Sequence, residues 1–535
     1  MRAARCRGQR YAAAAFRRAC FCIVLLFAAR PAAATIRYQV SLDHPEQHIF
    51  HVEMWIPKPA AETFVALPAW NALYQIRDFS HRLRDIKATC CAVDLGPPTK
   101  PYEVNKDTWL INVPVPASHR EEEVMVSYSI EWDDPGPFNS QLNEHHAFVN
   151  LAEILMYIPD RRSEDTSVQF TDLPVAWRTA VELASGRTDN TYVASNYDTL
   201  VDAPVEAGKF DEFEFDNGGT HFRVVVDGYN WNRRFLEEGL RRITGYELQM
   251  MGGPPFDPPL REYTFIFHID PVVDIGAGGM EHANSDAIAM RSVDSAVQVA
   301  AHEFFHAWNV KRIRPRSLEP VDYTKEQYTR ALWFAEGVTS TYGAYALART
   351  GLWSKSQFYA DLASQIGMLQ SRPARKWQSV EESSLDAWFE KYDGYNDPDR
   401  SISYYNKGQI VGVMLDLAIR DATDNHKSLD DVMRRMNAEY ARQGKFYDDS
   451  DGIRAAVEEV ADRSFEDFFR RYVSGTDEIP YDDFLSKAGL ELKIDASRSA
   501  YSAARAGLPY SISEISNPTD RQRRIREGLL HGTTD

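Results

Sequence analysis

The chain has 535 residues, of which 44% are hydrophobic and 26% are charged. That balance is ordinary for a globular protein and leaves room for about two to four domains. The formal net charge is −18. A surface of this sign repels nucleic acid and anionic lipid, which argues against both as partners.

Residues 1–34 differ from the rest of the chain. They contain seven arginines and no acidic residue. An apolar run at 20–29 precedes small residues at 31–34 that suit a signal peptidase. The pattern predicts a secretory signal peptide over 1–34, and hence a periplasmic or extracellular protein without stable membrane association. An uncleaved anchor is the alternative, although the apolar run is short for a membrane span.

Only two of the five cysteines lie beyond the predicted signal peptide, the adjacent Cys90 and Cys91. Two cysteines are too few for a disulfide framework. The favoured interpretation is a strand in which one side chain faces in and the other out. A vicinal disulfide is the alternative, and it would be strained.

Residues 35–195 predict a domain of antiparallel β-structure. Short runs of alternating hydrophobicity recur, for example at 36–40, 109–113 and 123–130, and turns rich in Pro, Gly and Asp separate them. We expect a sandwich or a saddle-shaped sheet.

One histidine pair in this region, His145-His146, has the residue types of a metal site. Adjacent residues of a strand point to opposite faces, so the two rings cannot converge on one ion. Surface or loop histidines are therefore the favoured interpretation.

From about residue 230 the hydrophobic period changes. Residues 232–251 predict an amphipathic helix that ends at Gly252-Gly253-Pro254-Pro255. A strand is expected at 263–268, and the glycine-rich segment 276–282 follows it. Glycines beside a strand let the main chain of a ligand come close.

The segment 299–309 contains His-Glu-x-x-His. On a helix, residues four apart share a face, so His302 and His306 can aim their imidazoles at one point. Glu303 can reach a water held at that point. This is the zinc-protease arrangement, in which two histidines hold the metal and the glutamate is the general base. The helix is expected to end near the basic residues 311–314, before Pro315.

A zinc site of this kind needs a third protein ligand and one open position for water. Glu336 is the candidate, because it lies on a separate predicted helix, about 326–349, thirty residues beyond His306. Aromatic and small residues surround it in the sequence, which indicates burial, and a buried carboxylate requires a cation.

The pattern beyond residue 350 is almost entirely helical up to about 488. Helices are expected at 355–371, 405–421, 428–442, 451–461, 464–473 and 480–488. The last segment, 489–535, is rich in Ser, Ala and Arg and then strongly charged, which predicts a poorly packed tail.

Four segments together resemble the glycyl aminopeptidase family, a branch of the gluzincin metallopeptidases that is related in its catalytic domain to thermolysin. They are 302–315, 332–340, Gly278-Gly279-Met280-Glu281-His282 and Tyr404-Tyr405-Asn406-Lys407-Gly408. Four motifs in the right order are far more specific than one.

The resemblance covers about residues 35–490 and implies an α+β multidomain fold. It implies an N-terminal antiparallel β domain (35–195), a thermolysin-like zinc catalytic domain (196–350) and a helical domain (351–488) that completes the active site. Many members of the family carry a PDZ domain after the helices. Residues 489–535 are too few for such a domain and show no PDZ-like pattern, so we expect none in this segment.

The resemblance also implies the chemistry of the site. One zinc ion per chain is held by His302, His306 and Glu336, and Glu303 passes the proton of the attacking water to the leaving amine. A tyrosine donates a hydrogen bond to the oxyanion. The spacing to Lys407-Gly408 favours Tyr405 over Tyr404 for that role.

The resemblance implies a substrate-binding segment made of Gly278, Gly279, Met280, Glu281 and His282. In that segment, Glu281 forms an ion pair with the free α-ammonium group of the substrate. The family is also related to the alanyl-type aminopeptidases, in which an asparagine follows that glutamate. In this chain His282 follows it. Asn309 either supports a ligand histidine or is a helix residue near its end.

The expected function is an exported zinc aminopeptidase acting on peptides with a free N-terminus. A preference for small residues, Gly or Ala, comes from the resemblance alone. The alternatives are a zinc endopeptidase of the thermolysin type, which has no use for Glu281, and an inactive peptide-binding protein on the same scaffold.

Overall fold

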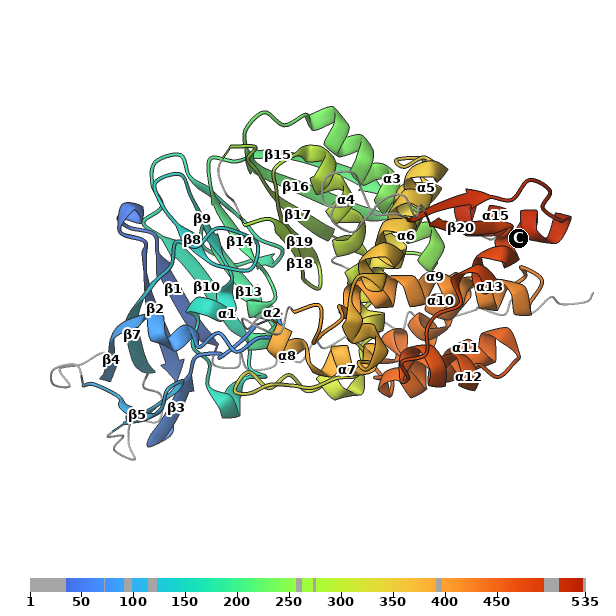
Figure 1. Ribbon diagram of the computed structural model, residues 1–535. Coiled ribbons are helices and arrows are strands. Elements are labelled where there is room, and N and C mark those ends of the chain that lie inside the picture. Colours follow the sequence, from blue (N-terminus) through green and yellow to red (C-terminus); the bar gives the residue numbers. More distant parts are fainter. Residues whose placement is uncertain are drawn as a thin grey trace, which may run out of the picture.

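The computed structural model describes residues 35–71, 73–90, 99–113, 123–255, 262–272, 276–390, 397–494 and 510–532. The predicted signal peptide, Cys91 and the side chain of Cys90 lie outside the described residues. A β-rich part, a central sheet covered by helices and a helical part follow one another along the chain (Figure 1). This confirms the predicted α+β class.

The N-terminal domain forms because alternating hydrophobicity gives each strand one buried face. β2 (Ile49–Pro57) and β7 (Glu123–Glu131) pair antiparallel over nine residues each, with their apolar side chains in the core. The other strands and short helices are β1 (Ile36–Ser41), β3 (Glu62–Ala66), β4 (Leu83–Cys90), β5 (Tyr102–Asn105), β6 (Thr108–Asn112), β8 (Gln141–Leu142), β9 (His146–Val149), α1 (Leu151–Ile154), β10 (Thr166–Thr171), β11 (Arg178–Ala180), β12 (Ala184–Ser185), β13 (Thr191–Ala194), α2 (Tyr197–Val201) and β14 (Val205–Gly208).

These strands form three sheets. The largest has the order β12-β13-β10-β1-β2-β7-β4, and the others are β11-β14-β9-β8 and β3-β6-β5. β1 and β10 run parallel, so the domain is not purely antiparallel. β14 pairs with β9, so the N-terminal sheets continue past the predicted boundary at residue 195.

The central unit is a mixed sheet of order β15-β16-β17-β19-β18. β16, β17 and β19 run parallel, while β18 runs antiparallel at the edge. Seven of the eight residues of β17 are buried, as expected for a strand covered on both faces. The bounds are β15 (Asp211–Asn217), β16 (Thr220–Gly228), α3 (Arg233–Met251), β17 (Glu262–Ile269), β18 (Gly278–Glu281), β19 (Ser285–Met290) and α4 (Val293–Glu303).

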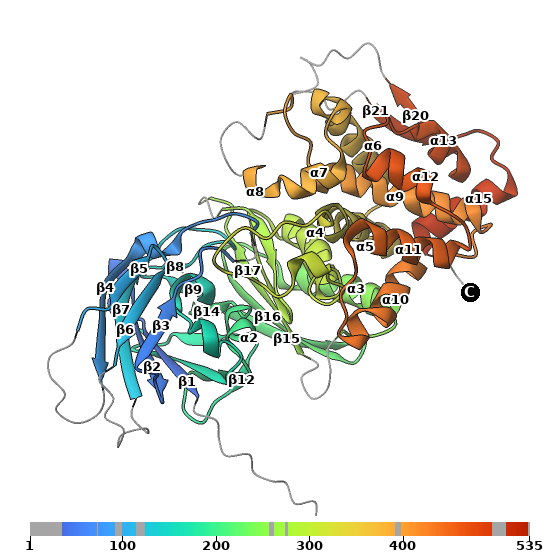
Figure 2. The ribbon, with the colours of Figure 1, turned by 90° about the horizontal axis from the view of Figure 1, so that it is seen from below.

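Both faces of this sheet are covered. Helices α3 and α4 share a large apolar core with one face. On the other side, Phe148 of β9 packs in a smaller cluster with Val225 of β16 and Ile266 of β17. Figure 2 shows the central sheet between the N-terminal sheets and the helical part.

The helical part surrounds α9, most of whose residues are buried. Its elements are α5 (Thr339–Arg349), α6 (Lys355–Gln370), α7 (Val380–Leu385), α8 (Ala387–Glu390), α9 (Tyr404–Ala422), α10 (Leu429–Glu439), α11 (Asp449–Ala461), α12 (Glu466–Phe468) and α13 (Tyr481–Leu485). Among the described residues, no helix combines the length and the hydropathy that crossing a membrane would need.

The prediction of a poorly packed tail is wrong for the described residues 510–532. β20 (Leu490–Ile494) pairs antiparallel with β21 (Tyr510–Glu514), and α15 (Asp520–His531) follows. Ile525 and Leu529 of α15 are buried in the main core, and the Leu529 carbonyl accepts a hydrogen bond from Arg349. The apolar positions of α15 are helically spaced, but its charge density hides them in the sequence.

Candidate active site

The His-Glu-x-x-His segment begins as an α-helix and then tightens. Ser292 caps α4 by accepting a hydrogen bond from the Ser295 amide, and the α-helix ends at Glu303. A 3-10 turn, η4 (Phe304–Ala307), carries His306. The predicted continuous helix to about residue 311 is therefore too long, yet the two histidines still meet.

The two imidazoles face one another across this turn. The Nε2 atoms of His302 and His306 are 3.0 Å apart. Glu336 lies on a π-helical segment, η6 (Trp333–Val338), a geometry that frequently marks functional sites. Its Oε2 atom is 3.5 Å from Nε2 of His302 and 3.2 Å from Nε2 of His306.

The close approach of two helices holds Glu336 in place. A Cβ atom on Gly337 would lie 2.5 Å from the Cα of Gly408, so η6 and α9 can touch only where both residues lack a side chain. Glu336, with 3% of its surface exposed, has no room to turn toward solvent.

These three side chains fit a zinc ion. Ligand atoms about 2.0–2.2 Å from tetrahedral zinc lie about 3.3–3.6 Å from one another, close to the three separations found here. Nδ1 of His306 is 2.6 Å from the carbonyl oxygen of Asn309, an acceptor only. The proton of a neutral His306 therefore sits on Nδ1, which leaves the Nε2 lone pair for a metal.

The electrostatics of the three side chains agree with this fit. Burial alone would lower the pKa of His306, but the Glu336 carboxylate outweighs it and raises that pKa to about 10. The two imidazoles in turn lower the pKa of Glu336 despite its burial. A buried carboxylate held ionised beside two imidazoles is a site for positive charge.

Glu303 lies beside this point, packed against the glycine-rich strand. A Cβ atom on Gly279 would lie 2.2 Å from Oε1 of Glu303, so glycine is required there to leave space for the carboxylate. Burial raises the pKa of Glu303 to about 8. A carboxyl group with such a pKa can both take and return a proton near neutral pH.

The remaining predicted residues line the same region. Gly278, Gly279, Met280 and Glu281 form β18, the edge strand beside the zinc-binding turn, and His282 follows it. Within the part of the chain that the structure describes, the Glu281 carboxylate makes no ion pair or hydrogen bond. It remains available for a cation.

The two tyrosines of α9 are distinguished by their surroundings. Tyr404 is buried, whereas Tyr405 is 40% exposed and its ring centre lies 6.2 Å from that of His302. Desolvation and the nearby Glu336 carboxylate raise the pKa of Tyr405 well above its usual value. Its hydroxyl therefore stays protonated and can donate a hydrogen bond.

Sequence reasoning missed two side chains that lie beside the predicted site residues. Asp202, at the C-terminal end of α2, contacts His282 and Lys311, at 3.2 and 2.8 Å. Tyr74, in the loop between β3 and β4, lies close enough for Glu336 and Glu281 to help raise its pKa. No local pattern marks either residue, because both reach the site from another domain.

The interpretation of His145 and His146 as surface or loop histidines is wrong for one of them. His145 is exposed, but His146 of β9 is buried and lies 3.0 Å from Oε1 of Glu206. Oε2 of Glu206 lies 2.9 Å from Nε2 of His268 on β17. His145 precedes β9 and stays exposed, whereas His146, the first residue of β9, reaches the domain boundary.

Comparisons with known proteins agree with the site. The profile described as M61 glycyl aminopeptidase matches residues 295–411, and that of the Peptidase M61 N-terminal domain matches residues 37–209. Together they span more than half of the chain. No curated protein sequence matches.

Among solved structures, an aminopeptidase N family protein from Idiomarina loihiensis is 24% identical over 86% of this chain and 79% of that chain, with a TM-score of 0.79. This likeness shows the fold. Aminopeptidase A of Legionella pneumophila, in complex with aspartic acid, is 14% identical over 82% of this chain and 49% of that chain, with a TM-score of 0.46. An M1 zinc metallopeptidase from Deinococcus radiodurans is 12% identical over 94% of each chain, with a TM-score of 0.45.

The family profiles, the shared fold and the convergent side chains lead to one assignment. The chain belongs to the M61 glycyl aminopeptidase family and is a metallopeptidase.

Proposed function

We propose that the protein is a zinc aminopeptidase that removes single residues from the free N-terminus of peptides. The observation that carries the proposal is the convergence of His302, His306 and Glu336 on one point. The buried base Glu303 and the unpaired carboxylate of Glu281 lie beside that point. Together they form a hydrolytic centre with a counter-charge for an α-ammonium.

His302, His306 and Glu336 would hold the ion. When bound, zinc supplies Lewis acidity that polarises the scissile carbonyl and acidifies water. Glu303 removes a proton from the attacking water and returns it to the nitrogen of the leaving amine. Tyr405 donates a hydrogen bond to the oxygen that gains negative charge as water adds.

Glu281 decides where the peptide is cut. An α-ammonium paired with its carboxylate leaves the first peptide bond facing Glu303. An internal segment brings no cation to this carboxylate, which would then stay desolvated and unpaired. The geometry therefore favours the exopeptidase over a thermolysin-type endopeptidase.

Hydrolysis of a fluorogenic peptide with a free N-terminus, compared with its acetylated form, tests the proposal. We expect the free form to be cleaved at least about a hundredfold faster, because acetylation removes the charge that Glu281 pairs. Chelation should abolish the activity and added zinc should restore it. Equal rates for the two peptides would refute the exopeptidase, and full activity without metal would refute the zinc site.

Export is part of the proposal. It rests on the arginine-rich and apolar residues 1–34, which lie outside the described residues. Sequencing the N-terminus of the protein purified from the producing cell tests it. A mature chain that begins near Thr35 is expected, and retention of residue 1 on soluble protein in the cytoplasm would contradict it.

The preference for Gly or Ala that the resemblance implies stays a prediction. The feature of this chain that bears on the N-terminal side chain of the substrate is the cavity beside Glu281.

A further inference from the structure

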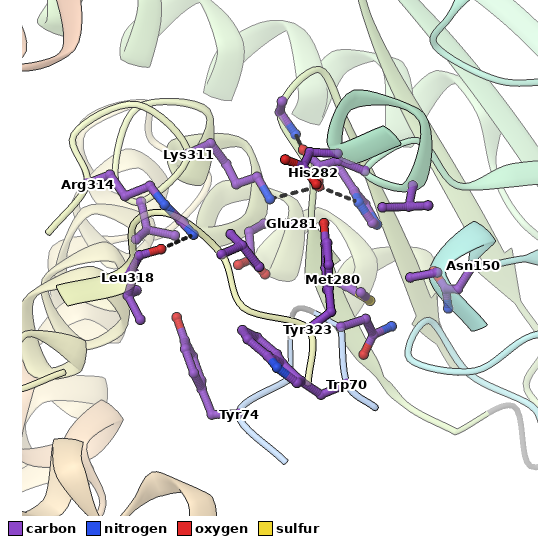
Figure 3. A pocket seen from close by; sticks show the side chains of 18 of the residues that line it. Trp70, Tyr74, Asn150, Met280, Glu281, His282, Lys311, Arg314, Leu318 and Tyr323 are labelled. Carbon is purple, nitrogen blue, oxygen red and sulfur yellow. Dashed lines mark hydrogen bonds and ion pairs between the residues drawn. The ribbon is translucent and has the colours of Figure 1, made fainter. Parts of the chain in front are cut away.

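Glu281 lines one side of a cavity, together with its neighbours Met280 and His282 (Figure 3). The cavity has a volume of about 210 Å³. On the same scale, one water molecule occupies roughly 10–15 Å³. A substrate that begins with glycine would leave this whole space filled with water. The cavity is large enough for a long side chain.

Two domains build the walls. Trp70 and Tyr74 come from the loop between β3 and β4, and Met280 comes from β18. Val310 and Tyr323 belong to the segment that follows the zinc-binding turn. Most of these walls are apolar or aromatic, which favours apolar contact with a ligand.

The N-terminal loop is fastened to the catalytic part, so the cavity is preformed. The indole N–H of Trp70 donates to the carbonyl of Asp322 at 2.7 Å. The amide of Ala69 donates to the carbonyl of Tyr323 at 2.8 Å, and the amide of Arg77 donates to the carbonyl of Ala69 at 2.8 Å. A rigid wall can discriminate between side chains by their size.

The cavity lies where a bound substrate would direct its first side chain. When Glu281 holds the α-ammonium and the first carbonyl faces Glu303, the side chain of the N-terminal residue must leave its Cα away from both. Glu281 lines this cavity, which therefore lies next to the position proposed for the α-ammonium. We infer that this cavity receives a long, uncharged N-terminal side chain, so that the substrates extend beyond Gly and Ala.

This inference rests on the proposed aminopeptidase function and adds a substrate class to it. An uncharged side chain is favoured because the charged residues of the walls already have partners, apart from Glu281, which holds the α-ammonium.

Asp202 and Lys311 form an ion pair of 2.8 Å at one wall, and His282 lies 3.2 Å from the same carboxylate. Arg314 is paired with Glu319, and the carboxylate of Asp198 is 3.0 Å from Arg162. Once Glu281 holds the α-ammonium, a charged side chain entering here would lose its hydration and find no free counter-charge.

Uncharged polar groups are compatible with the cavity. The amide of Asn71 has no hydrogen-bond partner for either its nitrogen or its oxygen among the described residues, and the oxygen of Asn150 has none. Both residues line the cavity. A glutamine side chain can therefore be tolerated as well as a methionine.

A panel of aminoacyl substrates with one common leaving group tests the inference on the wild-type enzyme. Ala and Met differ in size, while Gln and Glu differ in charge at almost equal size. We expect kcat/KM for Met and for Gln to exceed that for Ala by at least about tenfold, because each buried methylene adds to transition-state binding. We expect Glu and Lys to fall at least about tenfold below Gln and Met, respectively.

Two substitutions should change the preferred charge in opposite directions. Lys311→Met leaves Asp202 without its main partner, so the ratio of Lys to Met substrates should rise at least about tenfold. Asp202→Asn leaves Lys311 unpaired, so the ratio of Glu to Gln substrates should rise by a similar factor. Zinc content and thermal unfolding check that both variants are folded.

The matched control is Lys487→Met. Lys487 and Asp421 form a similar, half-buried ion pair of 2.6 Å outside the cavity. This variant loses the same charge at a distant place, and its substrate ratios should match those of the wild type.

The outcomes separate the inference from the proposed function. Cleavage of Ala or Gly substrates at least tenfold above Met and Gln would overturn the inference while leaving the aminopeptidase in place. Unchanged charge ratios in both variants, with folding intact, would also overturn it. No cleavage of any unblocked substrate would overturn the proposed function, and the inference with it.

Discussion

Among the described residues, two clusters each contain two histidines and a glutamate, and their hydrogen bonding differs. In the catalytic cluster, the Nε2 atoms of His302 and His306 face each other at 3.0 Å, and a single oxygen of Glu336 contacts both. Two ring nitrogens and one oxygen thus point at a common centre. Such convergence leaves lone pairs that only a cation can satisfy.

The second cluster joins the N-terminal sheets to the central sheet. Glu206 of β14 uses its two oxygens separately, one for Nδ1 of His146 and the other for Nε2 of His268, at 3.0 and 2.9 Å. Asp227 of β16 adds a carboxylate oxygen 3.4 Å from Nδ1 of His146. Each contact is a hydrogen bond or an ion pair that is complete without an ion.

The comparison teaches that residue types alone do not define a metal site. Both clusters bring histidine nitrogens and carboxylate oxygens close to one another, within 3.5 Å in the catalytic cluster and within 4.8 Å in the other. Only in the catalytic cluster does one carboxylate oxygen serve two ring nitrogens whose lone pairs also face each other. We therefore expect the catalytic cluster to bind zinc and the domain-boundary cluster to link two domains through charge.

Zinc content should separate the clusters most sharply. His306→Ala removes a predicted ligand, so zinc should fall from one per chain to near zero. Activity should fall at least about 10⁴-fold, which corresponds to several kcal/mol of lost charge stabilisation. The matched change His146→Ala should keep one zinc per chain, measured by elemental analysis of dialysed protein. Loss of one equivalent of zinc in His146→Ala would show that the second cluster is also a metal site.

The next largest effects are expected from one Glu→Gln substitution in each cluster. One should change kcat, and the other should change the free energy of unfolding. Glu303→Gln should lower kcat about 10³-fold while zinc is kept, because the amide cannot accept the proton of water. Glu206→Gln should keep zinc but lower the free energy of unfolding by about 3 kcal/mol, because it leaves His146 buried without its main anionic partner.

Steady-state kinetics and denaturant unfolding of both variants check this contrast. If Glu303→Gln retained kcat, the general-base assignment would fall. If Glu206→Gln left unfolding unchanged, the cluster would contribute no link between the domains.

Substitution of the two tyrosines at the start of α9 tests which of them donates a hydrogen bond in the catalytic site. Tyr405→Phe should lower kcat about 10²-fold with little change in zinc content, since one oxyanion donor is lost. Tyr404→Phe is the control, because Tyr404 is buried and its ring centre lies 4.7 Å from that of Tyr405. A larger loss of kcat in Tyr404→Phe than in Tyr405→Phe would reverse the assignment.

Much of the catalytic cluster could be predicted because its signals are local. The spacing of His302 and His306 and the apolar neighbours of Glu336 appear within single segments. Helical periodicity placed α6 and α9 within a residue of the expected ends, and Ser354 and Ser403 cap them as a helix start requires. Local propensity and tertiary packing agree in these elements.

The rest depends on contacts that no local pattern records. Glu206 and His268 are separated by more than sixty residues and meet only because β14 and β17 lie in neighbouring sheets. The 3-10 turn at His306 and the π-helical segment around Glu336 depart from ideal helices because tertiary packing decides there. The cavity beside Glu281 is likewise built by loops from two domains.

The smallest expected effect is the pH dependence that the second cluster contributes to the free energy of unfolding. Burial would lower the pKa of His146, but the charge of Glu206 outweighs it and raises the pKa from 6.5 to about 9. A group whose folded pKa is raised stabilises the protein fully below its unfolded pKa and loses that effect as pH rises through the folded pKa. The contribution of His146 to the free energy of unfolding should therefore fall between pH 6.5 and about 9.

The slope from one group cannot exceed about 1.4 kcal/mol per pH unit. Other groups titrate in the same window, since burial lowers the pKa of Lys407 to about 8 and raises that of Glu303 to about 8. The difference in stability between wild type and Glu206→Gln cancels the contributions of groups outside the cluster, because the variant changes only Glu206, the main anionic partner of His146. Denaturant unfolding across this window should therefore give wild-type and variant stabilities that converge as the pH rises. A constant difference would mean that His146 does not carry the charge that links the two domains.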